Sequence, residues 1–315
     1  MSRKKISFVS PCYNEEGNVE NFYELVKEQL EKTNRYDYEI VFVNDGSKDK
    51  TIEKLKAIYA KDKKHVKVVN FLRNFGKEAA LLAGLKEAEG DYVCTIDSDM
   101  QQEPFYGVEM ADILEKNDSI DMVAARPKNV KDPATLAFFK KSFYKIINGV
   151  SDVPFYQGAS DFRTFRSNIR DVIVSLPEHT RFSKGIFSWV CPNIECIEYE
   201  VQERGSGETK WSFTKLMKYA IQGICSFSDM PLTIPVVIGG LELLICVLMF
   251  IAQIIGLCIG LDTINYGVRW WIMLILLLTG MQSVSTGIVA QYMAYVHKES
   301  VNRPIYIVKE ILKEE

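Results

Sequence analysis

Short apolar runs and amphipathic segments alternate through the first half of the chain. The apolar runs, rich in Val, Ile, Phe and Tyr, cover residues 6–9, 38–43, 66–71, 91–96 and 121–125. Between them, three segments place apolar side chains three and four positions apart: residues 19–31, 51–60 and 78–89. The runs predict strands, and the segments predict helices that cover them. The first 230 residues are therefore expected to form an α/β domain with a Rossmann-like, mostly parallel sheet.

A different pattern begins at residue 231, where charged residues almost disappear. Only three residues between positions 231 and 296 carry a charge: Glu242, Asp262 and Arg269. The apolar segments 235–261 and 270–296 are each long enough to cross a hydrocarbon core with some tilt. Residues 231–296 are thus expected to form a transmembrane hairpin with a short link at 262–269, followed by a tail of residues 297–315.

Positive charge lies on the outer flanks of this hairpin. The flanking residues are Lys210, Lys215 and Lys218 before it and Lys298, Arg303, Lys309 and Lys313 after it. By the positive-inside rule, the polar domain and both termini face the cytoplasm. The expected location is therefore the inner (plasma) membrane, with the chain crossing it twice.

Two segments outside the hairpin combine aromatic and basic residues at helical spacing. They are residues 138–147 and 211–224. Such a segment can lie in the headgroup plane, or it can pack on the core with its lysines in water. The position of 211–224 directly before the hairpin favours interfacial amphipathic helices.

Charge balance and cysteine spacing exclude several protein classes. The chain carries 38 Lys and Arg against 41 Asp and Glu, so no basic excess is present to bind nucleic acid. Its seven cysteines form no C-x-x-C pair, which argues against a zinc site or a disulfide framework. The thiols are expected to be reduced, as in a cytosolic domain.

Carboxylates follow three of the predicted strands. These strands end in Ser10-Pro-Cys-Tyr-Asn-Glu-Glu16, in Val43-Asn-Asp-Gly-Ser47 and in Thr95-Ile-Asp-Ser-Asp-Met-Gln101. Ligands of open α/β sheets bind outside the carboxyl ends of the strands. Asp97 and Asp99 lie two positions apart and can converge on one cation, to which Gln101 can add its amide oxygen. Oxygen-only ligation favours Mg²⁺ or Mn²⁺.

A cation between these carboxylates would also attract the diphosphate of a nucleotide, because it reverses the local charge. The usual glycine-rich nucleotide motifs are missing. Gly76-Lys77-Glu78 lacks both the Ser or Thr and the earlier glycine of a Walker loop, and Gly205-x-Gly207 has no third glycine. Kinase and dehydrogenase functions are therefore disfavoured.

Six motifs occur together in one order along the chain. They are P-C-Y-N-E-E, V-N-D-G-S, R-N-F-G-K, D-S-D-M-Q, S-D-F-R, and R-x-x-x-x-x-K-W followed by two apolar spans. In this combination the chain resembles family-2 glycosyltransferases of the polyprenyl-phosphate type, above all the bactoprenol (undecaprenyl-phosphate) glucosyltransferases. The resemblance implies a GT-A fold. It also implies inverting, metal-dependent transfer of a sugar, glucose from UDP-glucose, to undecaprenyl phosphate at the cytoplasmic membrane face.

The same resemblance assigns the donor site. It implies nucleotide contacts by Pro11, Tyr13, Glu15, Asp45, Lys77, Asp97, Ser98 and Asp99, and metal contacts by Asp97, Asp99 and Gln101. Pro11, Tyr13 and Glu15 would border the nucleoside, and Asp45 would accept a hydrogen bond from the base. The alternatives are an ordinary Asp-Gly turn at Asp45 and loop packing for Tyr13.

On the acceptor side, the resemblance implies phosphate contacts by Arg126, Lys140, Lys141 and Arg163 and catalytic roles for Asp161, Arg204 and Lys210. Each of these cations could instead be a solvated surface charge. Asp161 matches a position often proposed as a base, but a phosphate monoester is already largely dianionic at neutral pH. We therefore expect Asp161 to hold the sugar, the acceptor's cations or the developing positive charge, with pairing to Arg163 as the structural alternative. The three histidines, His65, His179 and His297, match no motif.

Several functions remain open at this stage. A dolichyl- or polyprenyl-phosphate mannose synthase using GDP-mannose has a similar soluble part, and a non-catalytic membrane adaptor could retain the fold. A processive polysaccharide synthase is disfavoured because Arg269-Trp270 lacks the preceding Gln of a Gln-x-x-Arg-Trp motif. The expected partners are a nucleotide-sugar donor, a polyprenyl phosphate and a membrane. From its relatives' spans, the chain is expected to be a homotetramer.

Overall fold

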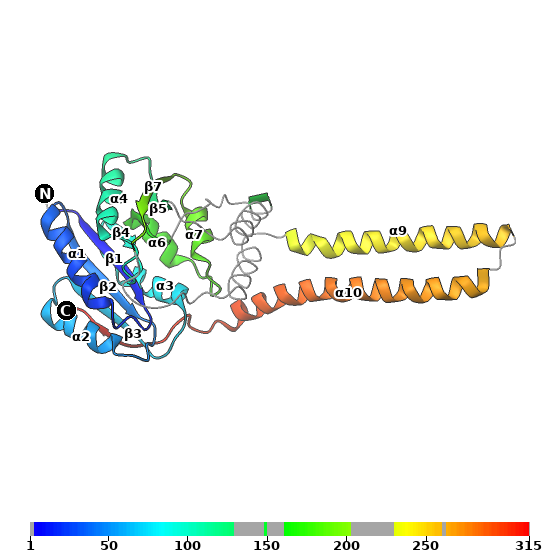
Figure 1. The fold of residues 1–315 in the computed structure, drawn as a ribbon, viewed down its shortest axis with the longest axis horizontal. Coiled ribbons are helices and arrows are strands. Elements are labelled where there is room, and N and C mark those ends of the chain that lie inside the picture. The colour runs from blue at the N-terminus through cyan, green and yellow to red at the C-terminus, as the bar shows by residue number, and fades with distance from the viewer. Residues whose placement is uncertain (1–2, 129–147, 150–160, 203–229, 260–262, 315) are drawn as a thin grey trace.

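The structure, a computed structural model, describes residues 3–128, 148–149, 161–202, 230–259 and 263–314 (Figure 1). The two predicted interfacial helices, at 138–147 and 211–224, lie outside the described residues. The same holds for four predicted site residues: Lys140, Lys141, Arg204 and Lys210.

Eight strands form one mixed sheet in the order β7-β5-β6-β4-β1-β2-β3-β8. The strands are β1 (Lys5–Cys12), β2 (Asp37–Asn44), β3 (Val66–Phe71), β4 (Tyr92–Thr95), β5 (Met122–Lys128), β6 (Arg163–Arg166), β7 (Ile194–Glu200) and β8 (Val308–Leu312). Neighbours β4-β1-β2-β3 pair in parallel, and so do β5 and β7. The antiparallel strands are β6, between β4 and β5, and β8, beside β3. The five predicted strands and the mostly parallel core of the sheet are confirmed.

Helices cover both faces of this sheet (Figure 1). They are α1 (Val19–Thr33), α2 (Thr51–Lys61), α3 (Lys77–Glu87), α4 (Pro104–Lys116), α6 (Ser167–Ser175) and α7 (Ser183–Val190). Neighbouring residues Phe8 and Val9 of β1 point to opposite faces. Phe8 lies in a buried cluster with one side chain from each of α1, α2 and α4: Phe22, Leu55 and Met110. Val9 lies in a second cluster with one side chain from each of α3, α6 and α7: Ala83, Ile173 and Phe187. The domain therefore has three layers.

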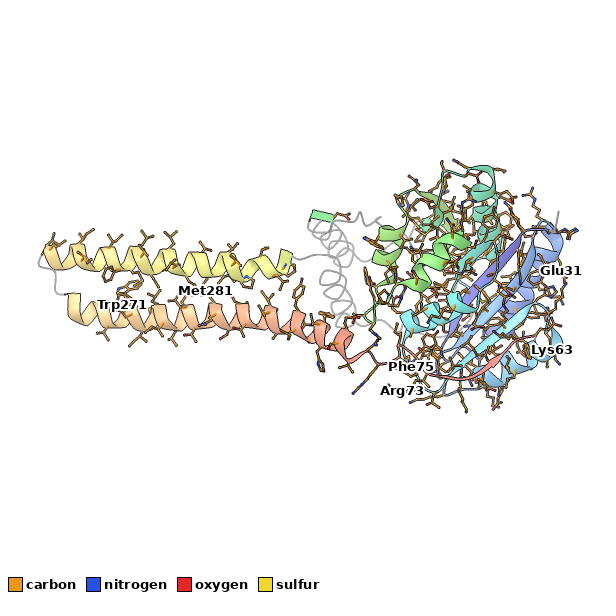
Figure 2. All side chains as sticks on the ribbon, turned by 180° about the vertical axis from the view of Figure 1, so that it is seen from behind. Glu31, Lys63, Arg73, Phe75, Trp271 and Met281 are labelled. Carbon is orange, nitrogen blue, oxygen red and sulfur yellow. The ribbon has the colours of Figure 1, made fainter. Side chains whose placement is uncertain are left out.

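Two long helices extend away from this head as a hairpin (Figure 1). They are α9 (Met230–Cys258) and α10 (Thr263–Val301). Within them, Pro231–Gly256 and Trp270–Val301 are long and apolar enough to cross a membrane. Figure 2 shows side chains projecting along the length of both helices, and apolar ones such as Val236 and Leu276 are exposed to 75% and 68%. The structure thus contains the apolar hairpin that the sequence predicts.

The ends of the predicted hairpin need correction. Residues 263–269 are not a loop, because α10 already begins at Thr263, and the helix continues beyond position 296 to Val301. Pro235 is not the first residue of a span but lies inside α9. The charge at Arg269 suggested a longer link, but a helix can carry a charge where its end reaches past the apolar layer.

The predicted C-terminal tail is also more than a tail. Residues Val308–Leu312 return to the head as β8 and pair antiparallel with β3. Asn70 donates a hydrogen bond from Nδ2 to Oε1 of Glu310 over 2.9 Å. The ring of Tyr306 stacks on Phe71, with 4.9 Å between the ring centroids. The head therefore is not complete at residue 230, as the sequence suggested, because its sheet includes a strand that follows the hairpin.

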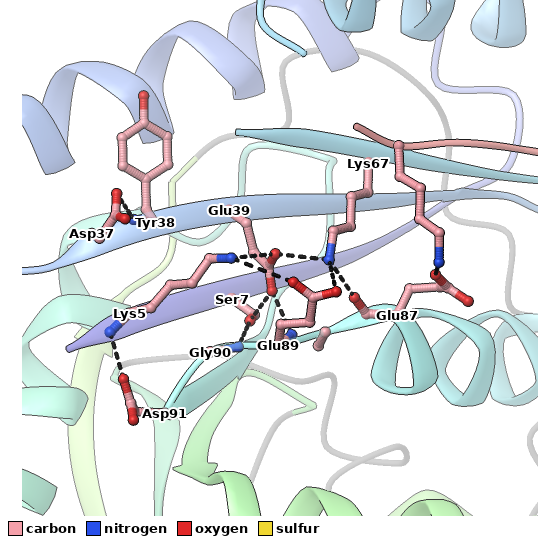
Figure 3. A network of polar contacts seen from close by, with 12 residues as sticks. Lys5, Ser7, Asp37, Tyr38, Glu39, Lys67, Glu87, Glu89, Gly90 and Asp91 are labelled. Atoms are coloured by element: carbon pink, nitrogen blue, oxygen red, sulfur yellow. Dashed lines mark hydrogen bonds and ion pairs between the residues drawn. The ribbon is translucent and has the colours of Figure 1, made fainter. Parts of the chain in front are cut away.

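A buried acid holds together the amino-terminal edge of the sheet (Figure 3). Glu39 of β2 is 1% exposed and accepts hydrogen bonds from Oγ of Ser7, at 2.6 Å, and from the backbone N–H of Glu89, at 2.5 Å. The ammonium groups of Lys5 and Lys67 lie 2.9 and 3.1 Å from its Oε2. Burial alone would raise the pKa of Glu39, but these hydrogen bonds and the Lys5 charge outweigh it and hold the pKa below its usual value. The network ties β1, β2, β3 and the start of β4 together.

Glu39→Gln is expected to destabilise the head by about 3 kcal/mol at pH 7, because breaking a buried ion pair leaves buried cations uncompensated. The folded-state pKa of Glu39 is depressed, so its contribution is present above the unfolded-state pKa and is lost as pH falls through the folded-state pKa. The difference in the free energy of unfolding between wild type and Glu39→Gln should therefore shrink below pH ~4.3, the ordinary pKa of a Glu side chain. Hydrogen-exchange protection of the β2 amides in the full chain, between pH 7 and 3, measures it. Glu31→Gln, at an exposed position, is the control, and equal protection in both variants would contradict this role.

Candidate functional site

The loops that follow β1 and β2 interlock at the carboxyl-terminal edge of the sheet. The backbone N–H of Asn14 donates to Oγ of Ser47 over 3.0 Å, and Oδ1 of Asn14 accepts from the N–H of Lys48 over 2.9 Å. The N–H of Glu15 donates to Oγ1 of Thr51 over 2.9 Å. Since β1 and β2 run parallel, their carboxyl ends meet. The predicted juxtaposition of these motifs is therefore observed.

Asp45, at the end of β2, fixes the loop that follows β3. Its carboxylate is 3% exposed and accepts the backbone N–H groups of Phe75 and Gly76, at 2.6 and 2.9 Å, and Nδ2 of Asn74, at 2.9 Å. Burial raises the pKa of Asp45, and the two backbone hydrogen bonds oppose the increase. Gly46 follows with φ of +62°, and a Cβ there would clash with the backbone of residue 73. These contacts favour a turn and a loop tether over direct contact with a nucleotide base.

Lys77 begins α3 directly after this loop and bridges two carboxylates. Its Nζ lies 2.8 Å from Oδ1 and 2.9 Å from Oδ2 of Asp97, and 3.0 Å from Oδ2 of Asp161. Thr95, at the end of β4, donates a hydrogen bond from Oγ1 to the carbonyl oxygen of Asp161 over 2.6 Å. Asp97 follows the same strand. Strand β4 therefore positions both acids, and the Asp45 tether positions the lysine between them.

Charge within this cluster shifts two pKa values in opposite directions. Burial alone would lower the pKa of Lys77, but the charges of Asp161 and Asp97 outweigh it and raise the pKa above its usual value. Burial alone would raise the pKa of Asp161, but Lys77, Lys184 and Arg163 hold it well below its usual range. Lys77 is therefore a cation and Asp161 a carboxylate throughout the neutral pH range.

The turn after β4 presents the predicted metal ligands. Met100 adopts a φ of +67°, and Oδ1 of Asp99 accepts the N–H of Gln101 over 3.2 Å. Among the residues that the structure describes, no group of three or more His, Cys, Asp or Glu could hold a metal ion. Two carboxylates and an amide suit a cation that takes its other ligands from phosphate and water, as Mg²⁺ commonly does. The donor set thus fits a substrate-bound cation and does not form a closed protein cage.

A cleft of about 960 Å³ opens beside the Lys77 cluster. Its lining includes Lys77, Asp97 and Asp161. It also includes residues from two further segments: His179, Thr180, Arg181 and Lys184, and His297, Lys298, Val301, Arg303, Pro304 and Ile305. The first segment leads into α7, and the second contains the end of α10 with the residues after it. The end of the membrane hairpin is therefore a wall of the cleft.

The predicted nucleotide-binding residues do not all reach this cleft. Pro11 lies at the end of β1, and Tyr13 and Glu15 lie in the turn that follows it. Ser98 is 2% exposed, so its side chain is closed to a ligand in this conformation. Of the predicted site residues that the structure describes, Lys77, Asp97 and Asp161 line the cleft.

Two predicted phosphate-binding residues lie away from the cleft. Arg126, on β5, is exposed and pairs with Glu198 at 2.7 Å. Arg163, on β6, is 3% exposed, and its guanidinium carbon lies 4.3 Å from the centre of the Phe187 ring, inside the core. The charge of Arg163 helps to lower the pKa of Asp161, but its guanidinium lies in the core, so the geometry does not support phosphate binding by Arg163.

The sequence did not reveal that three further cations, Lys184, Lys298 and Arg303, line this cleft. Lys298 and Arg303 were interpreted only as flanking charges of the hairpin. No local motif marks Lys184. Its segment and the end of α10 are more than a hundred residues apart in the sequence and come together only in the folded chain. His179 and His297, for which no role was expected, also line the cleft.

Comparison with known proteins agrees with this arrangement. Residues 7–169 match Glycosyl transferase family 2. A prophage bactoprenol glucosyl transferase homolog of Escherichia coli K12 is 38% identical over 319 residues, which cover 98% of this chain and 100% of that protein. The bactoprenol glucosyl transferase of Shigella phage SfV is 37% identical, over 97% of this chain and 98% of that protein. An uncharacterized glycosyltransferase of Synechocystis is 35% identical, over 98% and 95%.

The family match spans β1 to the start of α6 and includes Lys77, Asp97 and Asp161. The relatives also align with the hairpin and the strand that follows it, since they cover nearly the whole chain. The head has the GT-A-like, mostly parallel sheet that the motifs implied. The chain belongs to glycosyl transferase family 2 and is a glycosyltransferase.

Proposed function

We propose that this glycosyltransferase transfers glucose from UDP-glucose to undecaprenyl phosphate, at the cytoplasmic face of the membrane. One observation carries the proposal: the Lys77, Asp97 and Asp161 cluster shares its cleft with the end of α10. A soluble donor and a lipid-bound acceptor can meet at such a boundary. The names of the E. coli and phage relatives supply the acceptor and the sugar.

The donor would bind at the end of β4. Asp97, Asp99 and Gln101 would hold Mg²⁺ or Mn²⁺, which would neutralise the diphosphate and stabilise it as a leaving group. Lys77 forms an ion pair with Asp97. If a divalent cation bound Asp97 instead, the ammonium group of Lys77 would be free to contact a phosphate. Pro11, Tyr13, Glu15 and Ser98 stay proposed nucleotide contacts, and Asp45 would act indirectly by placing Lys77.

The acceptor brings its own nucleophile. A phosphate monoester has a second pKa near ~6 and is largely dianionic at pH 7, so it needs no strong base. Its oxygen forms the new bond to the anomeric carbon, while the bond from that carbon to the diphosphate breaks. The nucleoside diphosphate leaves with the electron pair, and the configuration inverts. Asp161, held ionised beside Lys77, would stabilise the positive charge that develops on the sugar.

The membrane placement follows from the hairpin. Helix α9 starts and α10 ends on the side of the head, while α9 ends and α10 begins at the far end (Figure 1). If both helices cross the membrane, the head and both termini lie on one side, and the flanking lysines favour the cytoplasm. We propose this two-span topology in the inner membrane, with residues 1–230 and the returning β8 as the catalytic unit and a homotetramer as the assembly.

Two alternatives make different predictions. A mannose synthase would use GDP-mannose with the same cluster, because the two donors share the diphosphate that the cation holds. A non-catalytic adaptor would have no need for Asp97, Asp99 and Asp161 together in one region, and their presence argues against it.

The decisive experiment presents the purified full-length protein with undecaprenyl phosphate, Mg²⁺ or Mn²⁺, and a panel of UDP- and GDP-sugars. We expect a hexosyl monophosphate lipid from UDP-glucose, identified by mass, with UDP released in equal amount. A product from GDP-mannose alone would identify the mannose synthase. Release of neither nucleotide and no lipid product under any condition would contradict the enzymatic proposal.

A further inference from the structure

Arg181 is 4% exposed and donates to the backbone carbonyls of Ile173 and Leu176, but three other cations line the same cleft as the Lys77 cluster. Lys184 lies in the first turn of α7, Lys298 in the last turn of α10, and Arg303 two residues after α10 ends. We call these three residues the basic wall. They come from two segments far apart in the sequence and converge on one cavity.

The basic wall differs from Lys77 in its charge balance. Lys77 has two carboxylate partners within 3.0 Å. Within the described part of the chain, Lys184, Lys298 and Arg303 have no carboxylate within ion-pair distance. Cations gathered in a cleft without a carboxylate in direct ion-pair contact favour binding of an anion, particularly one that accepts charge-assisted hydrogen bonds.

The acids near this wall are already engaged. Glu299 accepts the backbone N–H groups of His179, at 3.1 and 3.0 Å, and of Thr180, at 2.9 Å. Glu78 accepts the N–H of Ser183 over 3.0 Å and also the hydroxyl of that residue. These carboxylates therefore serve the loop that leads into α7.

The same contacts hold the two segments together. Nε2 of His179 lies 2.9 Å from Oδ1 of Asn302, one residue before Arg303. Glu299 is next to Lys298, and Glu78 is next to Lys77. A continuous frame thus runs from the end of α10 through residues 179–183 to α3 and fixes the basic wall relative to the acids opposite. Such pre-organisation lowers the cost of ordering side chains on binding.

The position of the basic wall indicates which of two anions it would bind, the lipid phosphate or the donor diphosphate. The candidate span Trp270–Val301 contains Lys298 within its last turn, and Arg303 follows it directly. A phosphate at the end of a membrane-embedded chain must stay near this level, whereas the donor diphosphate reaches the acids at the end of β4. Lys184 and Asp161 line the same cleft, and the charge of Lys184 helps to hold the pKa of Asp161 below its usual range.

We infer that Lys184, Lys298 and Arg303 bind the phosphate monoester of the polyprenyl acceptor and position it for transfer. This inference rests on the proposed function. The membrane helix then acts as more than an anchor, because its end supplies part of the acceptor site. These three residues line the cleft, whereas the side chains of Arg126 and Arg163 do not.

The test uses Lys298→Gln, Arg303→Gln and the double variant in the full chain. The acceptor KM is expected to rise about tenfold for each single variant, as the loss of one charge-assisted contact implies. The KM for the donor should change less than about twofold, which is within ordinary surface effects. Arg303→Lys should retain most acceptor affinity. Lys309→Gln, an exposed position on β8 outside the cleft, is the matched control and should behave as wild type.

A binding measurement without donor separates this inference from the proposed function. Citronellyl phosphate, a short soluble prenyl phosphate, is titrated calorimetrically into the detergent-solubilised protein, with no bilayer present. Wild type should bind, and the double variant should lose about a hundredfold in affinity, whether or not UDP-glucose proves to be the donor. Equal binding by both proteins would overturn the inference. So would a loss confined to UDP binding, which would assign the cations to the donor, or a loss seen only with anionic vesicles, which would indicate general membrane attraction.

Discussion

Asp99→Asn is expected to lower kcat by about a thousandfold or more, since it removes a ligand from the cation that offsets charge on the leaving diphosphate. The amide is isosteric with the carboxylate, and Asp99 lies half-buried in the turn after β4, so folding should be little affected. Asp97 cannot compensate alone, because the cation would then keep only one of its two carboxylate ligands. The measurement is the initial rate of UDP release with undecaprenyl phosphate, over a titration of Mg²⁺ and Mn²⁺.

Chelation provides an independent check on the same site. EDTA should abolish the activity of wild type, and added Mg²⁺ or Mn²⁺ should restore it. Asp118→Asn, whose side chain is 97% exposed and pairs with Arg166, is the control and should keep its activity. Full activity of wild type in EDTA would contradict the assignment of Asp97, Asp99 and Gln101 to a metal.

Asp161→Asn is expected to lower kcat by about a hundredfold to a thousandfold at every pH, because the carboxylate no longer stabilises the developing charge on the sugar. The structure keeps the pKa of Asp161 far below its usual range, through Lys77, Lys184 and Arg163. A carboxylate with a depressed pKa stays ionised well below neutrality and is a weak base. It therefore cannot produce a fall in rate between pH 7 and 5.

The acidic limb of the pH profile should instead belong to the acceptor. As pH falls through ~6, the phosphate dianion takes up a proton and the rate should decrease with it. The midpoint pH of this acidic limb should be the same in Asp161→Asn as in wild type. The measurement is kcat/KM for the acceptor between pH 5 and 8. Thr95→Val is a useful companion, because it removes the hydrogen bond to the Asp161 carbonyl and leaves the carboxylate in place. Loss of the limb in Asp161→Asn, or rescue by azide or imidazole, would identify Asp161 as a general base.

The local elements of the head follow closely from the sequence. The predicted strand at 66–71 is β3 without change, and the predicted helices at 19–31 and 51–60 are extended by only one or two residues. These elements carry strong period-two or period-3.6 patterns, because each buries one face against a neighbour. The apolar hairpin is equally clear, because a segment without charge over more than twenty residues has few alternatives.

The strands that the sequence missed are the antiparallel ones, β6 and β8, and the edge strand β7. Strand β6 has four residues, and two of them are the arginines Arg163 and Arg166. Strand β8 is five residues long and includes Lys309 and Glu310. A short, charged strand such as β8 is common at a sheet edge, which must resist association, whereas β6 is a short strand inside the sheet. Their pairing is decided by the partner strand and not by their own composition.

The sequence by itself determined the chemistry that is available. Asp97, Asp99 and Gln101 come directly after one predicted strand, and ligands of open α/β sheets bind outside the carboxyl ends of the strands. The motif R-N-F-G-K likewise places Lys77 after a glycine, at the start of a helix. These relations act over a few residues, so the sequence can show them.

Only the tertiary structure decided which charged groups meet. Lys77 lies between Asp97 and Asp161, which are 64 positions apart in the sequence, and Glu299 of α10 holds the backbone of residues 179 and 180. Arg163, which a motif placed beside Asp161, is instead in the core. A side chain's charge is fixed by its type, but its partners depend on how the layers pack and on where the chain returns after the hairpin. The sheet is completed, and the cleft acquires its second wall, only because residues 297–312 fold back onto the head.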